Sequence, residues 1–192
     1  MQQNSEQSFY EEKISSELLF EGRVLTLWRD VVRLPNGKEA TREVVHHGGA
    51  VAVIPLLADG RVLMERQYRY AQGRTVFEIP AGKLDSPDED PVDAALRELR
   101  EETGASAGKI TPLGILVPSV AILTEKIYMY LAEDLSFGEK ELDEDEFLSV
   151  EAVPLEMLLD MVMRGELQDS KTQVAVMKTA RILEERRHAR EA

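Results

Sequence analysis

Cysteine is absent from the 192-residue sequence, and tryptophan occurs only once. The missing cysteines exclude disulfide bonds, thiolate zinc sites and cysteine nucleophiles. Positive charge is also scarce, because 23 lysine and arginine residues face 36 acidic ones, which gives a formal net charge of −13. Nucleic acid phosphates are bound by basic surfaces, so this balance argues against nucleic acid as a general partner. It does not exclude a small anionic substrate that arrives with its own metal ion.

Long apolar runs are missing as well. No stretch approaches the roughly 18 apolar residues of a membrane span, and the N-terminal sequence MQQNSEQSFYEEK lacks the apolar core of a signal peptide. We therefore expect a cytoplasmic protein with no membrane partner. The length suits one well-cored domain plus an extension, because two full domains would be cramped.

The segment GKLDSPDEDPVDAALRELREETGA, residues 82–105, predicts a helix that begins at Pro91 and stops at Gly104. Proline suits a first helical turn, acidic residues favour the positive N-terminal end, and glycine is a common stop. One side of this helix is apolar and can pack on a core; it carries Val92, Leu96, Leu99 and Thr103. Nearly opposite, at positions i, i+3 and i+4, lie Glu98, Glu101 and Glu102.

Three like charges so close together repel one another and weaken an isolated helix. A divalent cation would reverse this penalty, because hard cations such as Mg²⁺ take carboxylate oxygen ligands. The competing interpretation is a solvated acidic face on an amphipathic helix. The residues that surround the three glutamates favour the cation.

Those surroundings resemble the Nudix box, G-x5-E-x7-R-E-U-x-E-E-x-G-U, in which U is a bulky apolar residue. Glu89 is followed after seven residues by RELREETGA, residues 97–105, so that eight of the nine specified positions fall in register. Two departures occur: six residues instead of five separate Gly82 from Glu89, and the last apolar position is the small Ala105. The extra residue falls in the turn of residues 85–88, where insertions are well tolerated.

The first 45 residues predict a small antiparallel β unit placed before a main domain of residues 46–192. Residues 16–34 are strand-like, Pro35-Asn36-Gly37 supplies a hairpin turn, and residues 39–45 return as another strand. A small sheet with an apolar face needs a cover, and a second subunit is one way to provide it.

Two residues of this unit are candidate substrate contacts. Trp28 is either a core or dimer-packing residue or an indole that stacks on a base. Arg42 is either an ordinary surface arginine or a contact to a phosphate or base.

The remaining sequence predicts further strands and two helices. Strands are expected over residues 49–58, 61–70, 75–80, 110–117, 126–131 and 147–153, and helices over residues 154–163 and 171–187. The run 49–58 is continuously apolar, which is typical of a strand buried on both faces. No G-x-G-x-x-G or Walker pattern occurs, so this mixed order fits a layered α/β sandwich rather than a Rossmann unit.

Two side chains on these strands are further candidates for substrate binding. Arg69 ends a basic and aromatic cluster, and its planar fork suits phosphate, although a strand-end charge facing water is an equal alternative. Glu78 points away from Phe77 and Ile79, so it is either solvated or faces the site. The same strand leads to Ala81, whose carbonyl oxygen could serve as a backbone metal ligand.

Hydrolysis at phosphorus needs a general base as well as a metal. The three histidines lie away from the box, so we expect a carboxylate in this role. Its source would be the acid-rich loop of residues 133–146, which is either a solvated segment or an arm that reaches the site. Arg97 and Glu89 are interpreted as a supporting ion pair, because an arginine inside a metal cluster would repel the metal.

Beyond the box, most of residues 16–187 resembles the ADP-ribose pyrophosphatase branch of the Nudix hydrolases. The matching phrases are LPNGK, TREVVHHGGAVAVIPL, RQYRY, FEIPAGKLD, EDEFLSVEAVPLEML and RGELQDSKT. The resemblance implies an α/β fold, namely a Nudix-type α/β/α sandwich with a mixed sheet, and a domain-swapped homodimer. It also implies Mg²⁺-dependent cleavage of ADP-ribose into AMP and ribose 5-phosphate, with Mn²⁺ as an alternative ion.

The resemblance assigns roles residue by residue. Metal ligands would be the carbonyl of Ala81 with Glu98, Glu101 and Glu102. Glu144 or Glu146 would orient or deprotonate the water. Substrate contacts would be Arg42 and Arg69, and Trp28 would stack near the dimer seam.

One departure bears on the substrate. The branch usually has a Ser-Pro-Gly turn ahead of the strand that reaches Glu125, whereas this sequence reads PSVAILTE over residues 118–125. That loop tends to approach the terminal sugar, so GDP-mannose, ADP-glucose and other nucleoside diphosphate sugars stay open as substrates. Nucleoside triphosphate hydrolases of the family are generally shorter, and a non-catalytic Nudix-like binding module would have lost carboxylates that this sequence keeps.

Overall fold

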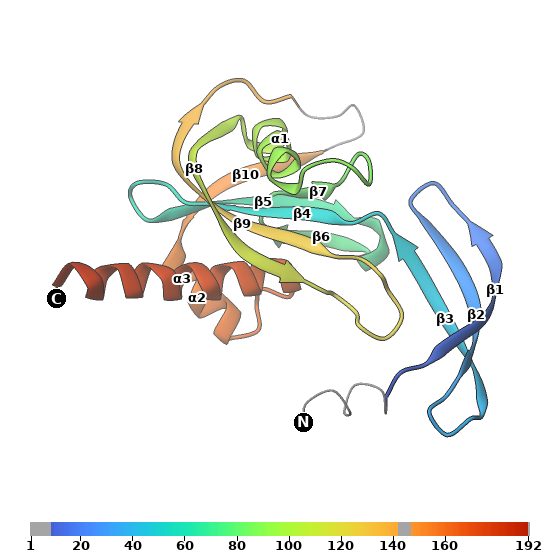
Figure 1. Cartoon of the computed structure of the whole chain (residues 1–192). Helices are drawn as coiled ribbons and strands as arrows, with labels where there is room; N and C mark the ends of the chain where they lie inside the picture. Colours follow the sequence, from blue (N-terminus) through green and yellow to red (C-terminus); the bar gives the residue numbers. More distant parts are fainter. Residues whose placement is uncertain (1–8, 142–146, 192) are drawn as a thin grey trace. The chain divides into compact units, whose positions relative to one another are not determined.

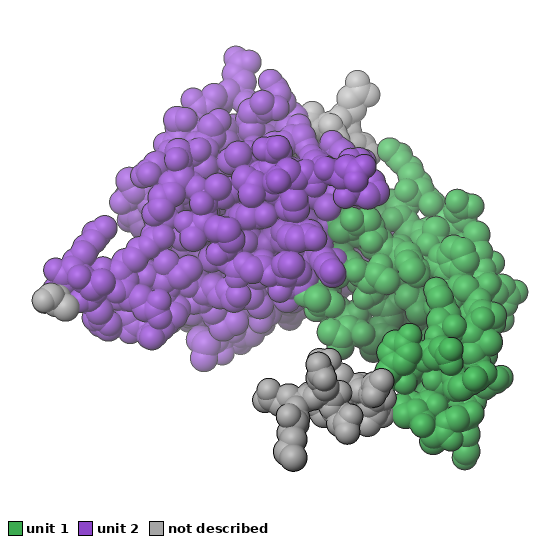
Figure 2. Space-filling model, viewed as in Figure 1, with its two compact units in different colours: residues 1–49, 117–125 green, residues 50–116, 126–192 purple. Residues whose placement is uncertain are grey.

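The computed structural model describes residues 9–141 and 147–191. The chain divides into two compact units, which Figure 2 shows in different colours. Unit 1 comprises residues 1–49 and 117–125, and unit 2 comprises residues 50–116 and 126–192. The division after residue 45 that the sequence suggests remains a proposal, and unit 1 additionally takes in residues 117–125.

Unit 1 contains an antiparallel sheet of three strands in the order β1-β2-β3 (Figure 1). These strands are β1 (Glu12–Glu21), β2 (Leu25–Arg33) and β3 (Glu39–His47). The turn between β2 and β3 is closed by a hydrogen bond of 2.8 Å from Leu34 N to Lys38 O. Gly37 adopts a φ of 80° in this turn, which glycine tolerates best. The predicted antiparallel unit is confirmed, with β1 beginning earlier than expected.

Unit 2 contains two sheets. The first has the order β7-β4-β9-β8, with β7 (Ala81–Lys83), β4 (Ala50–Pro55), β9 (Ile127–Phe137) and β8 (Ala105–Leu116). It is mixed, because β4 pairs parallel with β9 while its other pairings are antiparallel. The second sheet is antiparallel, with the order β10-β5-β6 and the strands β10 (Leu148–Pro154), β5 (Arg61–Arg69) and β6 (Arg74–Glu78). A short 3₁₀ turn, η1 (Tyr70–Gln72), joins β5 to β6.

Helices cover both faces of the sheets of unit 2 (Figure 1). On one side α1 (Pro91–Thr103) packs against β4, β7 and β8. On the other side α2 (Leu155–Met163) and α3 (Ser170–Glu191) pack against each other, and α3 also contacts β4, β8 and β9. The predicted α/β/α sandwich with a mixed sheet is therefore confirmed.

Strand β4 explains why the sandwich has two cores. All six of its residues are buried, and successive side chains of a strand point to opposite faces. Ala52 and Ile54 join the core that holds residues of α2 and α3, whereas Val51 and Val53 join the core that holds residues of α1. A continuous apolar run is thus required here, as its composition predicted.

The predicted loop of residues 133–146 is wrong over its first part. Strand β9 continues to Phe137, and β8 begins at Ala105, directly after α1. These extensions pair with each other, with Ala105 opposite Phe137 and Lys109 opposite Glu133. An ion pair of 2.9 Å joins Lys109 Nζ to Glu133 Oε2, so an acidic side chain is stabilised within a strand by its cross-strand neighbour.

The described helices are too short or too polar to cross a lipid bilayer.

Candidate active site

Helix α1 is fixed at both ends by local sequence. The side chain of Asp90 caps the first turn by accepting a hydrogen bond of 2.7 Å from Val92 N, and Pro91 opens the helix. At the other end Gly104 adopts a φ of 71°, and its amide donates to Arg100 O. A Cβ at residue 104 would lie 2.8 Å from Gly138 O, so glycine is also needed for this close approach. The predicted bounds of the helix are confirmed.

The acidic face of α1 is largely buried. Glu98 is 8% exposed and Glu102 is 2% exposed, so the interpretation of a solvated acidic face is wrong for both residues. Glu101 is partly exposed. Burying a carboxylate is costly unless other groups stabilise its charge. The groups around these glutamates must therefore stabilise their negative charge.

Arg97 provides much of that stabilisation. Its Nη1 donates to Glu98 Oε1 at 2.8 Å and to Glu101 Oε2 at 3.1 Å, and its Nε donates to Glu89 Oε1 at 3.2 Å. Burial opposes ionisation, but the charge of Glu98 and the hydrogen bonds to Glu89 and Glu98 outweigh it and raise the pKa of Arg97. The predicted ion pair with Glu89 is present. Contrary to the sequence argument, Arg97 also contacts two of the candidate metal ligands.

Glu89 connects this network to the turn before the helix. Its Oε2 accepts a hydrogen bond of 2.6 Å from Asp85 N, which with Arg97 lowers the pKa of Glu89. The other oxygen accepts from Arg97. The turn that carries the extra residue of the box is thereby attached to α1.

Strand β7 brings backbone atoms against the glutamates. The amide of Ala81 donates to Glu102 Oε2 at 2.9 Å, so the contact shown by the structure uses the amide of Ala81 and not the carbonyl expected as a ligand. A methyl group added at Gly82 would overlap the carboxylate of Glu98. Only glycine leaves room for that carboxylate beside the backbone. The short strand is held in place by its antiparallel pairing with β4.

A second charged cluster lies at the end of β6. Arg69 Nε donates to Glu78 Oε1 at 2.7 Å, and Lys171 Nζ donates to Glu78 Oε2. Glu78 is 2% exposed, so its solvated alternative is wrong. Burial by itself would lower the pKa of Arg69, but Glu78, with the charges of Glu102 and Asp169, raises it. The electrostatic influence of Glu102 on Arg69 relates this cluster to the acidic face of α1.

Sequence reasoning missed Lys171 as a member of this cluster. It is 9% exposed although lysine is rarely buried, and it lies in the first turn of α3. The available signal was the phrase DSKT, in which Asp169 precedes a helix start and can cap it. That signal marks the helix but does not identify the partner of the lysine.

The two candidates of unit 1 are held within their sheet. Trp28 Nε1 donates to Thr26 Oγ1 at 2.9 Å, and its ring meets His46 edge-on with centroids 6.1 Å apart. Arg42 forms a two-point pair with Glu11, with bonds of 2.9 Å from Nε and 2.6 Å from Nη2. The hydrogen bond to Glu11 raises the pKa of Arg42.

The catalytic candidates Glu144 and Glu146 lie outside the described residues. The segment leading toward them is attached to the end of α1, because Gly138 N donates to Gly104 O at 2.8 Å. Glu141 N also donates to Glu101 O at 3.2 Å. The beginning of the acidic segment is therefore anchored beside the helix that carries the candidate metal ligands.

Comparison with protein families gives two matches in this chain. The NUDIX domain family matches residues 46–173, more than half of the chain. The chain belongs to the Nudix family. Residues 11–45 match the Nucleoside diphosphate sugar hydrolase N-terminal domain family. The resemblance noted in the sequence is confirmed.

Several relatives of this Nudix protein align over most of its length. The ADP-ribose pyrophosphatase of Bacillus subtilis (strain 168) is 44% identical, covering 88% of this chain and 92% of the relative. The Methanol dehydrogenase activator of Bacillus methanolicus is 42% identical, and the alignment covers 88% of this chain and 91% of the relative. The ADP-ribose pyrophosphatase of Mycobacterium tuberculosis is 40% identical, covering 83% and 78%.

Among solved structures, the crystal structure of an ADP compounds hydrolase has a TM-score of 0.81 to this chain. The alignment covers 92% of this chain and 95% of the chain in the solved structure, at 23% identity, so the likeness concerns the fold.

Nudix hydrolases generally use a divalent metal ion, and the donor chemistry of α1 fits one. The candidate ligands are all oxygens, as hard divalent cations require, and Gly82 leaves room for the carboxylate of Glu98 beside the backbone. Within residues 9–141 and 147–191, however, no three acidic or histidine side chains already converge on one point. The glutamates of this Nudix protein are instead held by Arg97 and by the amide of Ala81.

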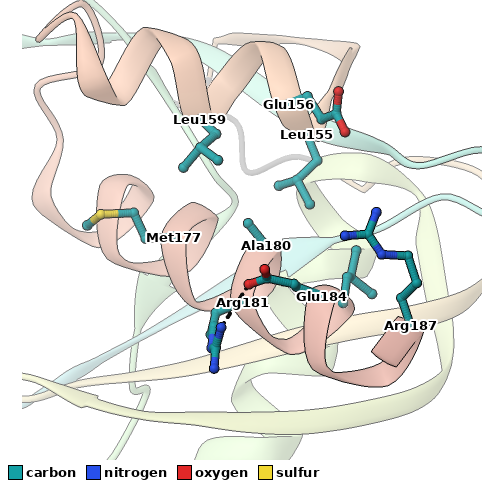
Figure 3. A pocket seen from close by; sticks show the side chains of 9 residues that line it. Leu155, Glu156, Leu159, Met177, Ala180, Arg181, Glu184 and Arg187 are labelled. Atoms are coloured by element: carbon teal, nitrogen blue, oxygen red, sulfur yellow. Dashed lines mark hydrogen bonds and ion pairs between the residues drawn. The ribbon is translucent and has the colours of Figure 1, made fainter. Parts of the chain in front are cut away.

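Unit 2 also contains cavities, and they differ in character. A cavity of about 520 Å³, called the polar cavity below, is lined mainly by polar and charged residues, among them Arg69, Glu78, Arg74 and Lys171. Another, of about 600 Å³, lies between α2 and α3 and is lined by apolar side chains that include Leu155, Leu159 and Met177 (Figure 3). Neither of these lining sets contains Glu98, Glu101 or Glu102, but the polar cavity includes Arg69 and Glu78 from the predicted site.

Proposed function

We propose that the protein hydrolyses the diphosphate bond of ADP-ribose or a related nucleoside diphosphate sugar, releasing a nucleoside monophosphate and a sugar phosphate. The observation that carries this proposal is the buried acidic face of α1. Glu98 accepts a hydrogen bond from Arg97 and lies in the space that Gly82 leaves beside the backbone. Glu102 accepts a hydrogen bond from the amide of Ala81. The relatives named ADP-ribose pyrophosphatases, at 44% and 40% identity, support the substrate class.

In this proposal Mg²⁺, with Mn²⁺ as an alternative, is held by Glu98, Glu101, Glu102 and the carbonyl of Ala81. When bound, the metal would neutralise the diphosphate and activate a water molecule. Arg97 and Glu89 keep the carboxylates in place, because Arg97 contacts two of them and Glu89 fixes its Nε. Binding of the metal would require Arg97 to share these carboxylates with a second positive charge.

Substrate binding is assigned to both units. Arg69 contacts a phosphate, and Glu78 acts by holding Arg69, since its carboxylate accepts from Arg69 Nε. In unit 1, Trp28 stacks on the base and Arg42 contacts a phosphate or base once it exchanges its pair with Glu11.

For the general base we propose Glu144 or Glu146. The anchoring of Glu141 N on Glu101 O supports this choice, because it brings the start of their segment to α1. Only one of the two should act as the base, so Glu144→Gln and Glu146→Gln should differ sharply. The kcat of one variant should fall by about 10²–10⁴-fold, and that of the other by much less. Equal mild losses of kcat in the two variants would contradict the assignment of the general base to this segment.

We also propose that the protein is a cytoplasmic homodimer joined through unit 1. Large apolar side chains of this unit are exposed in the single chain, among them Leu18 and Phe20 on β1. A second copy would cover them.

A second candidate activity is hydrolysis of GDP-mannose or ADP-glucose. It is favoured by residues 118–125, which lack the Ser-Pro-Gly turn usual in the ADP-ribose branch. In unit 1 this segment is fixed to β3, with Thr124 N donating to Val45 O at 3.0 Å and Glu125 lying 3.4 Å from His47 Nδ1. Its shape is therefore set by the sheet and could select a different sugar.

The test is phosphate-coupled turnover of ADP-ribose, ADP-glucose, GDP-mannose, UDP-glucose and deoxynucleoside triphosphates, with and without Mg²⁺. Preference for ADP-ribose would support the first proposal, and preference for another sugar nucleotide would support the second. Absence of turnover with every compound would overturn both and favour a non-catalytic binding module.

A further inference from the structure

The buried carboxylate of Glu78 is shared between two cations from distant parts of the chain. One oxygen accepts from Arg69 Nε at the end of β5, and the other accepts from Lys171 Nζ in the first turn of α3. Glu78 is 2% exposed and Lys171 is 9% exposed, so water competes little for either group. The hydrogen bond that each cation forms with Glu78 therefore limits which carboxylate oxygen the other cation can use.

The geometry of Arg69 shows the effect of this sharing. An arginine and a carboxylate prefer a two-point pair, in which two N–H groups donate to the two oxygens. Arg69 instead donates through Nε alone, and the second oxygen of Glu78 accepts a hydrogen bond from Lys171. Among the described residues, none accepts a hydrogen bond from the two terminal nitrogens of Arg69.

Lys171 is itself held in place by the start of α3. Its Nζ lies 3.1 Å from Asp169 Oδ2, and Asp169 also accepts a hydrogen bond of 3.0 Å from Thr172 N. The hydroxyl of Thr172, which is fully buried, accepts from Ile79 N at 3.0 Å. The start of α3 and the end of β6 are thereby joined directly beside Glu78.

We propose that Lys171 is a positioning residue, which occupies the second oxygen of Glu78 and so keeps the terminal nitrogens of Arg69 available to an anionic group of the nucleoside diphosphate sugar. The inference rests on the proposed function for the identity of that ligand. The polar cavity of about 520 Å³ that Arg69 and Lys171 line provides space for such a group.

Removal of the lysine charge has a defined consequence. Glu78 then offers both oxygens to Arg69, which turns inward into a two-point pair and withdraws its terminal nitrogens from the substrate. Binding should weaken while the chemical step, which depends on the acidic face of α1, changes little. A lysine that only stabilised the fold would alter the melting temperature without this selective effect.

The experiment compares KM and kcat for ADP-ribose with Mg²⁺ in the wild type, Lys171→Met, Arg69→Met and the double variant. Lys171→Met should raise KM about tenfold, the equivalent of one charged hydrogen bond, and change kcat less than about twofold. In the double variant the effect of Lys171→Met should disappear, because Arg69 is no longer present to be positioned.

The control is Lys178→Met, which removes an exposed lysine of the same helix that also donates a hydrogen bond. Lys178 Nζ donates to Leu113 O, far in sequence from Glu78, so this variant should lower thermal stability and leave KM unchanged. If Lys171→Met does not fold, Lys171→Gln keeps one hydrogen bond to Glu78 and should raise KM about threefold.

Three results would overturn the inference: a normal KM in a folded Lys171 variant, a loss confined to kcat, or losses that multiply in the double variant. The proposed function fails separately, because its failure would appear as absence of turnover in the wild type.

Discussion

Units 1 and 2 differ in what they expose and what they bury. In unit 1, nine of the ten residues of β1 are exposed, although the strand includes Ile14, Leu18 and Phe20. In unit 2, every residue of β4 is buried, and charged residues such as Glu102 and Lys171 are buried as well. Unit 2 therefore completes its core within one chain, whereas the sheet of unit 1 leaves apolar surface uncovered.

This contrast indicates where function constrains the sequence. Exposed apolar groups and buried charges both raise the free energy of an isolated folded chain. A binding partner can relieve the first cost, and a ligand or a network of ion pairs can relieve the second. The expected dimer contact accordingly belongs to unit 1, and the expected metal site belongs to unit 2.

The largest effect is expected from neutralising a buried carboxylate of unit 2. Glu102→Gln removes the charge but keeps an oxygen that can accept from Ala81 N, so the fold should remain intact. We expect kcat/KM with Mg²⁺ to fall by about 10³-fold or more, the equivalent of several kcal/mol of transition-state stabilisation. Steady-state kinetics with melting curves would measure both properties.

The matched control for this change is Glu185→Gln, which neutralises an exposed acid of α3 that pairs with Arg181. It should leave turnover unchanged. Unimpaired turnover in Glu102→Gln would contradict the assignment of the α1 glutamates as metal ligands.

A smaller effect is expected from displacing a carboxylate without changing its charge. Gly82→Ala adds a methyl group that overlaps the carboxylate of Glu98, so the side chain must move. A displaced ligand should lower kcat/KM by up to about 100-fold. Gly48→Ala is the control, because a Cβ there meets nothing within 4 Å. Equal activities of the two variants would show that the position of Glu98 is unimportant.

The third prediction concerns the exposed sheet of unit 1. Leu18→Asp places a charge on a side chain that is 42% exposed in the single chain. If a second copy covers this sheet, the dimer dissociation constant should rise about tenfold or more, as analytical ultracentrifugation would measure. Ile115→Asp, on an exposed position of β8, should leave association unchanged. A monomeric wild type would contradict the proposed dimer directly.

How far the fold could be predicted depends on whether a feature is local in sequence. Helix α1 was predicted to its ends because Asp90, Pro91 and Gly104 act within one turn of it. Strand β7 was missed, since its three residues become a strand only by pairing with β4. Residues 133–137 were taken for a loop because their acidic side chains suggest solvent, whereas pairing with β8 determines their conformation.

The candidate site follows the same rule. The spacing of Glu98, Glu101 and Glu102 on one helix face can be read directly from the sequence. Their burial depends on packing against other elements. The contact of Arg97 with Glu101 joins positions i and i+4 of the same helix, so the spacing alone could have indicated it. The pair of Lys171 and Glu78 joins residues 93 positions apart, so no local pattern could reveal it.

The smallest expected effect concerns the partly buried ion pairs of Glu133 in unit 2, which lie outside the proposed site. Burial opposes ionisation of Glu133, but hydrogen bonds from Arg186 and Lys109 lower its pKa. Because the pKa is lower in the folded state, the stabilisation is complete above the unfolded value of about 4.3 and is lost as pH falls through the folded value. Glu133→Gln should therefore reduce the free energy of unfolding by about 1 kcal/mol near neutral pH and by less at an acidic pH below the unfolded value, as urea titrations would measure. Glu17→Gln, which removes an exposed pair with Arg29 in unit 1, should have almost no effect at either pH, and an equal loss in both variants would contradict the contrast between the units.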